Sequence, residues 1–127
     1  MEAKILLDTN FLLIPAEFKV DIFSELERLM DRKYRIYILD KTVEELKGIQ
    51  QTQKGRNREA AKLALQLIET KQLNTIAANQ ESVDDSIVEL ADKDWIIGTQ
   101  DTLLRRRLRQ KHIQLLNLRN KKHLTIT

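Results

Sequence analysis

The chain has 127 residues and a net charge of +3, which fits one domain with one hydrophobic core and mildly favours an anionic partner. It contains no cysteine, so disulfides, thiolate zinc sites and cysteine nucleophiles are excluded. No apolar run approaches the roughly 18 residues that cross a bilayer. We therefore expect a protein without a signal peptide or membrane span, in the cytoplasm.

The first forty residues predict two strands and one helix. Apolar runs predict strands over 5–7 and 35–39. Pro15 interrupts the stretch 11–18, which favours a loop or a broken turn. Asp21 can cap a helix whose apolar stripe extends from Ile22 to Met30 at helical spacing.

The middle of the chain predicts two helices and a loop. Asp40 or Thr42 can cap a helix with Val43, Leu46 and Ile49 on its inner face. Gly48 and the polar residues 50–57 predict the end of that helix and a surface loop. A further helix is expected over 58–70.

The last third alternates in the same way. A short strand is predicted over 73–77. Ser82, with Asp85 three residues later, opens a helix in the manner of a capping box. A strand over 95–99 precedes Asp101 and a basic helix that continues to about Lys111. Two final strands are predicted over 113–118 and 124–126. This alternation predicts an α/β fold over 1–127, with a mainly parallel sheet covered by helices on both faces.

Acidic residues recur where predicted strands end and helices begin. They are Asp8, Glu45, Asp84 or Asp85, and Asp101. Each has an ordinary reading, since carboxylates cap helices and terminate strands. The carboxyl ends of parallel strands share one edge, however, and ligands bind there. Carboxylates gathered at that edge would repel one another and would favour Mg²⁺ or Mn²⁺.

Four short motifs, in order, resemble those of PIN-domain ribonucleases. They are Leu6–Asn10, Val43–Leu46, Asp84–Val88 and Thr99–Asp101. The resemblance covers nearly the whole chain. It is strongest to the PIN nucleases that cut pre-ribosomal RNA and their archaeal relatives, with toxin-type (VapC-like) nucleases second.

The resemblance implies a PIN-like fold and a metal-dependent endoribonuclease that uses Mg²⁺ or Mn²⁺. Asp8, Glu45 and Asp101 match catalytic metal ligands, and Asp85 or Asp84 matches the third acid. Asn10 and Thr99 match polar residues that support the acids.

The resemblance also implies partners. They are RNA, ribosomal precursor particles or an antitoxin, and a second copy in a homodimer. The alternatives are a catalytically weak RNA-binding scaffold and a toxin nuclease.

Basic residues provide the second functional signal. Candidates for binding RNA phosphates are Lys54, Arg56, Arg58, Arg105, Arg106 and Arg109. The ordinary alternative is a solvated charged surface. Few aromatic residues accompany them, so the pattern favours backbone binding over base stacking.

Overall fold

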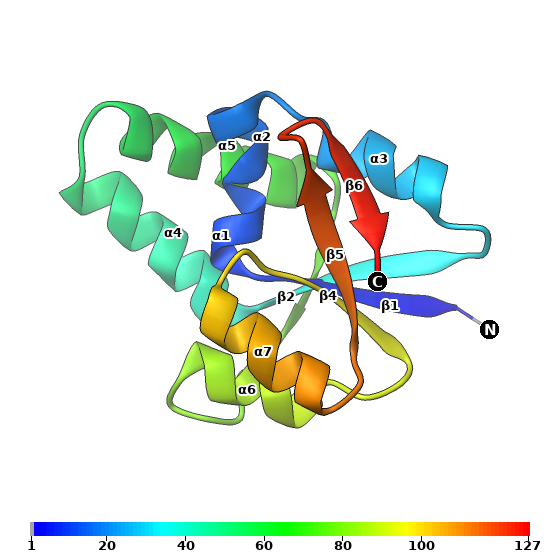
Figure 1. Cartoon of the computed structure of the whole chain (residues 1–127). Helices are drawn as coiled ribbons and strands as arrows, with labels where there is room; N and C mark the ends of the chain where they lie inside the picture. The colour runs from blue at the N-terminus through cyan, green and yellow to red at the C-terminus, as the bar shows by residue number, and fades with distance from the viewer. Residues whose placement is uncertain (1) are drawn as a thin grey trace.

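A computed structural model describes residues 2–127 and contains a six-stranded sheet (Figure 1). The strand order is β3-β2-β1-β4-β5-β6, and every neighbouring pair is parallel except β5 and β6. The strands are β1 (Ala3–Leu7), β2 (Tyr34–Leu39), β3 (Asn74–Ile76), β4 (Trp95–Gly98), β5 (Gln114–Arg119) and β6 (His123–Ile126). The predicted α/β fold with a mainly parallel sheet is confirmed.

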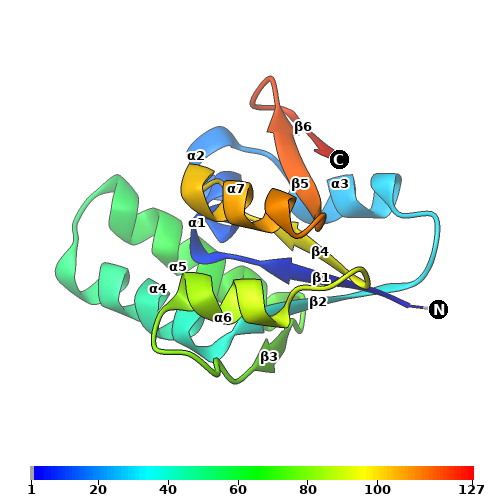
Figure 2. The ribbon, with the colours of Figure 1, turned by 60° about the horizontal axis from the view of Figure 1, so that its bottom comes forward.

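Helices cover both faces of the sheet. They are α1 (Thr9–Leu12), α2 (Ile14–Phe18), α3 (Ile22–Leu29), α4 (Asp40–Thr52), α5 (Arg56–Thr70), α6 (Val83–Leu90) and α7 (Thr102–Gln110). Because side chains alternate along β1, Ile5 and Leu7 pack with α1 to α5, whereas Leu6 packs with α6 and α7. Figure 2 brings the side that carries α6 and α7 toward the viewer.

Two segments predicted as loops are helical. Residues 11–18 form parts of α1 and α2, and Pro15 lies in the first turn of α2, where its missing N–H group costs no helical hydrogen bond. The helix α4 continues through Gly48 to Thr52, so only three residues, 53–55, connect it to α5. The predicted surface loop over 50–57 is therefore wrong, because packing of α4 against α5 outweighs the weak helix propensity of Gly48.

Most predicted helix caps are present. Asp21, Ser82 and Asp101 each accept hydrogen bonds from backbone N–H groups in the first turn that follows. The helix α4 differs, because Leu39 occupies its cap position and no side chain caps it. The Asp40 carboxylate instead accepts hydrogen bonds from the backbone N–H groups of Lys41 and Ala78, which ties α4 to the segment after β3.

Gly98 allows the two central strands to approach closely at their carboxyl ends. A Cβ atom at this position would lie 2.8 Å from a Leu7 methyl carbon and 3.1 Å from the Phe11 ring. Both neighbours are fully buried, so they have little room to move. Glycine therefore keeps the ends of β1 and β4 and the start of α1 in contact.

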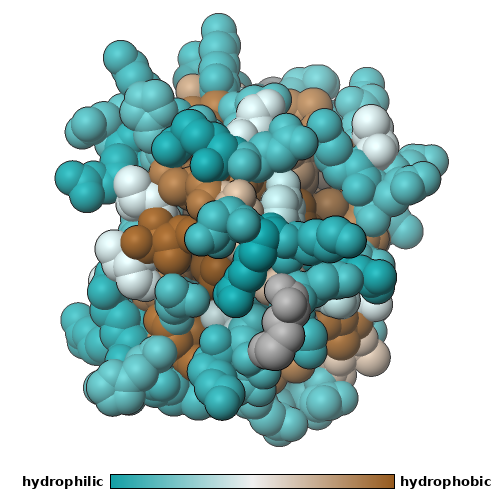
Figure 3. All heavy atoms as spheres, turned by 90° about the vertical axis from the view of Figure 1, so that its right-hand side faces the viewer, coloured by the Kyte–Doolittle hydropathy of each residue, from teal (hydrophilic) through white to brown (hydrophobic). Residues whose placement is uncertain are grey.

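The surface on the side of the chain's N-terminus is mostly hydrophilic, with small scattered apolar areas (Figure 3). Within residues 2–127, the only large hydrophobic side chain classed as exposed is Leu103, at the start of α7. No helix in the described part of the chain is long and apolar enough to cross a membrane.

Candidate active site

Two neighbouring strands bring the first and last acidic motifs to one edge of the sheet. Leu7 at the end of β1 pairs with Gly98 at the end of β4. The next backbone hydrogen bond joins the N–H of Asp8 to the carbonyl of Gly98 at 2.8 Å. Asp8 and the segment Thr99–Asp101 therefore leave the sheet side by side, as the strand-end argument predicts.

Asp8 is a buried carboxylate, 7% exposed, that is held by two hydrogen bonds. One oxygen accepts from the backbone N–H of Thr9 at 2.8 Å, and the other accepts from the Thr99 hydroxyl at 2.9 Å. Burial raises the pKa of Asp8 to about 6; the two hydrogen bonds oppose this rise, and the charges of Asp84 and Glu45 add to it. The charges of two other carboxylates thus act on a buried acid.

Glu45 is linked to the first motif through Thr9. Its Oε1 accepts a hydrogen bond from the Thr9 hydroxyl at 2.9 Å, and the buried Thr42 hydroxyl lies 3.3 Å from the same Thr9 oxygen. The neighbouring residue Glu44 has no such link among the hydrogen bonds of the described residues. Sequence reasoning identified Glu45 but missed Thr9 and Thr42, although Thr9 adjoins Asp8.

The third acidic motif places its two aspartates in different surroundings. Burial raises the pKa of Asp84, and the charge of Asp101 raises it further, while Arg107 opposes the shift. Asp85 is exposed and forms an ion pair with Arg107 at 2.8 Å. The charges of Asp84, Asp8 and Asp101 thus influence one another, whereas Asp85 is paired with a cation.

Asp101 caps the start of α7 and also belongs to the acidic group. Its Oδ1 accepts a hydrogen bond from the Leu104 N–H at 2.9 Å, which caps the helix. Its own N–H donates to the Thr99 hydroxyl oxygen at 3.1 Å. The cap and the acidic group therefore share one residue.

Asn10 joins the loop after β1 to the loop after β4. Its Oδ1 accepts hydrogen bonds from the Gln100 N–H at 2.9 Å and the Thr99 hydroxyl at 3.3 Å. The Gln100 side chain donates in return to the Asn10 carbonyl at 3.3 Å. Asn10, Thr99 and Gln100 thus form one set of hydrogen bonds beside Asp8, and Gln100 had no predicted role.

The donor chemistry of the four carboxylates fits a hard divalent cation. Asp8, Glu45, Asp84 and Asp101 offer only oxygen ligands, and their mutual repulsion is of the kind that a cation relieves. Among residues 2–127, however, no three acidic or histidine side chains lie close enough together to hold a metal ion. The carboxylates influence one another's pKa values, but they are not arranged as the ligands of a metal ion.

The predicted RNA-binding residues fall into two separate groups. Lys54, Arg56 and Arg58 are exposed around the turn between α4 and α5, where the Arg58 side chain donates to the Gln50 carbonyl at 3.1 Å. Arg106 and Arg109 are exposed on α7, the helix that begins after Asp101.

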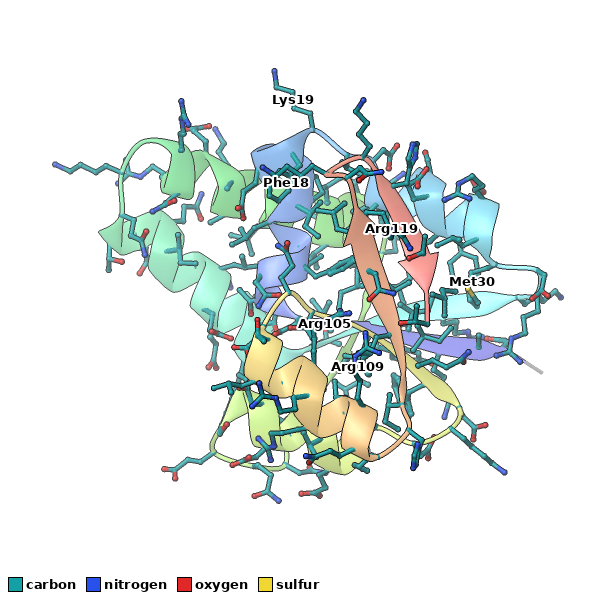
Figure 4. All side chains as sticks on the ribbon, in the orientation of Figure 1. Phe18, Lys19, Met30, Arg105, Arg109 and Arg119 are labelled. Atoms are coloured by element: carbon teal, nitrogen blue, oxygen red, sulfur yellow. The ribbon has the colours of Figure 1, made fainter. Side chains whose placement is uncertain are left out.

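Arg105 was also predicted to bind RNA, but its guanidinium is directed toward β5 (Figure 4). It is half-buried and donates to the carbonyls of Thr99 and Leu116 and to the side chain of Asn117. Burial lowers the pKa of Arg105, with a further contribution from the charge of Arg109. These contacts engage Arg105 within the protein, contrary to the expectation of a free phosphate ligand.

A groove of about 1090 Å³ lies away from the four carboxylates. It is lined by α2 and α5, with Phe18, Ala60 and Leu63 among its apolar residues.

Comparison with known proteins agrees with this architecture. A family model described as a PIN like domain matches residues 5–121. The chain is 32% identical over 127 residues to Ribonuclease VapC4 of Methanocaldococcus jannaschii, covering 97% of this chain and 95% of that protein.

A solved structure of the PIN domain endonuclease Utp24 has a similar fold. It superposes with a TM-score of 0.76 at 23% identity, over 97% of this chain and 90% of that one. The match to the family model over most of the chain and the relative of nearly equal length agree with each other. The chain therefore belongs to the PIN-like domain family.

Proposed function

We propose that this protein is a metal-dependent endoribonuclease that hydrolyses RNA phosphodiester bonds at the edge of the sheet formed by β1 and β4. The observation that carries the proposal is Asp8, a buried acid with a pKa of about 6 that feels the charges of Glu45 and Asp84. The 32% identity to a protein named a ribonuclease supports the reaction class.

In this proposal Asp8, Glu45, Asp84 and Asp101 hold one or two divalent cations, Mg²⁺ or Mn²⁺. A bound cation of this kind supplies a nucleophilic water at neutral pH and neutralises charge on the phosphate. We assign the third position to Asp84, because its charge acts on Asp8 and the charge of Asp101 acts on it, whereas Asp85 forms an ion pair with Arg107.

The protein's own groups prepare this edge in three ways. The Thr99 hydroxyl lowers the pKa of Asp8 against the effect of burial, which favours the charged carboxylate. Thr9 holds Glu45 toward the same edge. Arg106 and Arg109, exposed on the helix that Asp101 caps, are placed to neutralise RNA phosphates without reading the sequence.

The test is cleavage of end-labelled RNA, one single-stranded and one hairpin, by purified protein with Mg²⁺, with Mn²⁺ or with EDTA. We expect cleavage with a divalent ion and none with EDTA. Asp84→Asn should cut about 10-fold or more slowly, and Asp85→Asn provides the matched control on the adjacent residue. RNA binding without cleavage under every metal condition would instead support the scaffold alternative.

A second candidate within the same chemistry is a toxin nuclease that an antitoxin keeps silent. The named relative favours it, because that protein carries the name of the toxin-type subgroup predicted from the sequence. Co-purification of a small protein encoded beside this gene, together with loss of RNA cleavage in the complex, would support this role. A role in ribosomal RNA processing predicts instead that precursor ribosomal RNA is cut at a defined site.

A further inference from the structure

Arg105 occupies the point where the pairing of β4 and β5 ends. The last paired residues of the two strands are Gly98 and Leu116. Just beyond this pair, one nitrogen of Arg105 donates to the Thr99 carbonyl at 3.1 Å and to the Leu116 carbonyl at 2.9 Å. The side chain thus bridges the two strands after their own ladder stops.

The other end of the guanidinium is fixed by Asn117. The second terminal nitrogen of Arg105 donates to Asn117 Oδ1, and Asn117 in turn donates to the Thr127 hydroxyl at 3.0 Å. A guanidinium is a planar fork of donors, so three acceptors in this arrangement fix its orientation. Arg105 is therefore held on both sides by the fold.

Thr99 transmits this restraint to the acidic edge. Its carbonyl accepts from Arg105, and its hydroxyl donates to Asp8 and accepts from the N–H of Asp101. A single residue thus lies between the guanidinium and two of the four carboxylates. Movement of the Thr99 backbone would disturb both contacts at once.

We propose that Arg105 is a positioning residue, which clamps the turn of Thr99 to Asp101 against β5 so that Asp8 and Asp101 keep their places. This inference rests on the proposed function and refines it. It also separates Arg105 from its neighbours Arg106 and Arg109, which are exposed and free to meet RNA phosphates.

Lys111, the residue that follows α7, provides a matched control. Its ammonium donates to the carbonyls of Val88 and Ala91 at the end of α6, so Lys111→Met also removes one positive charge and two hydrogen bonds to main-chain carbonyls. These contacts lie away from Thr99. Arg105→Met and Lys111→Met therefore remove the same charge but leave different carbonyls without a donor, and Arg105→Met also removes the hydrogen bond to Asn117.

The experiment measures three quantities for the wild type, Arg105→Met, Arg105→Lys and Lys111→Met, well below the lowest melting temperature. They are the single-turnover rate of RNA cleavage at saturating protein with Mn²⁺, RNA affinity in EDTA, and hydrogen exchange of the Gln100 and Asp101 amides. We expect Arg105→Met to cut about 10-fold or more slowly, with an RNA affinity close to that of Lys111→Met. Arg105→Lys should recover part of the rate, because an ammonium can still donate to a carbonyl.

Other outcomes would overturn the inference. A normal rate in Arg105→Met, with RNA affinity weaker than in Lys111→Met, would make Arg105 a phosphate contact. Equal losses of rate in Arg105→Met and Lys111→Met would show a general effect on the fold.

Hydrogen exchange separates this inference from the proposed function. If the wild type cuts no RNA, the proposed function fails, and hydrogen exchange alone shows whether Arg105 holds the turn of Thr99 to Asp101. Faster exchange of Gln100 and Asp101 in Arg105→Met than in Lys111→Met supports it, and equal exchange rejects it.

Discussion

The four carboxylates of the candidate site lie on two kinds of structural element: two follow strands, and two lie on helices. Asp8 and Asp101 follow adjacent strands. Their carboxylates accept hydrogen bonds from backbone N–H groups, and the Thr99 hydroxyl donates to Asp8 and accepts from the N–H of Asp101. Glu45 and Asp84 lie on the helices α4 and α6; Glu45 has an exposed side chain whose bond to Thr9 holds it to this edge. The strand-borne carboxylates are therefore fixed by more hydrogen bonds than the helix-borne ones.

Removal of the strand-borne acid should have the largest effect. Asp8→Asn keeps the shape of the side chain but loses a charge that we assign to metal binding. We expect cleavage to fall by about 100-fold or more, while RNA binding in EDTA stays unchanged. Rates from end-labelled RNA and affinities from fluorescence anisotropy check both expectations. Cleavage by Asp8→Asn at the parent rate would remove Asp8 from the site.

The stability of the metal-free protein should depend on pH through the same residue. The pKa of Asp8 is raised from 3.8 to about 6 in the folded state, so the folded protein binds this proton more tightly than the unfolded chain. The contribution of Asp8 to the free energy of unfolding is complete below about pH 4, and it is lost as the pH rises from about 4 to 6. A shift of this size corresponds to about 2–3 kcal/mol.

Urea unfolding in EDTA at several pH values measures this contribution, with Asp8→Asn as the reference. The variant should unfold with a free energy that depends less on pH, and at neutral pH it should be the more stable of the two. Parallel pH profiles for both proteins would show that burial does not perturb Asp8.

The helix-borne acids provide a sharper contrast between adjacent residues. Asp84→Asn should reduce cleavage about 10-fold or more, because Asp84 lies in the field of Asp8 and Asp101. Asp85→Asn should change the rate little, because Asp85 is exposed and its ion pair with Arg107 is of a kind that contributes weakly. The reverse order of effects would return the third position to Asp85.

Thr99 tests how far the strand-borne half depends on its hydrogen bonds. Thr99→Val keeps the shape but removes the hydroxyl that donates to Asp8 and accepts from Asp101. We expect the rate of cleavage to fall by up to about 10-fold, because that change corresponds to the free energy of about one hydrogen bond to a charged group. Thr99→Ser should restore most of the rate. A fully active Thr99→Val would show that Asp8 keeps its place without this contact.

The strand-borne half was predictable from the sequence because buried strands are short apolar runs, and their ends are marked by polar residues. The choice between Asp84 and Asp85 was not made from the sequence, although a signal was present. Asp84 precedes the buried Ile87 by three residues, close to one helical turn, whereas Asp85 precedes it by two and lies on another side of α6.

The misreadings have local physical causes. Pro15 was read as an interruption, although proline is well tolerated in the first turn of a helix. Arg105 was grouped with its basic neighbours, and no local pattern separates it from Arg109, which likewise follows a buried leucine. The acceptors of Arg105 are carbonyls on other elements, and only the folded chain brings those carbonyls to it.

The most direct test of the central claim is a Mn²⁺ titration of the isotopically labelled protein followed by NMR. Paramagnetic broadening falls steeply with distance from the ion, so it reports where the cation binds. We expect the amides of Asp8, Asn10, Thr99 and Asp101 to broaden first, together with those near Asp84, and Asp8→Asn to suppress the effect. Broadening centred elsewhere, or unchanged in Asp8→Asn, would contradict a cation site at this edge of the sheet.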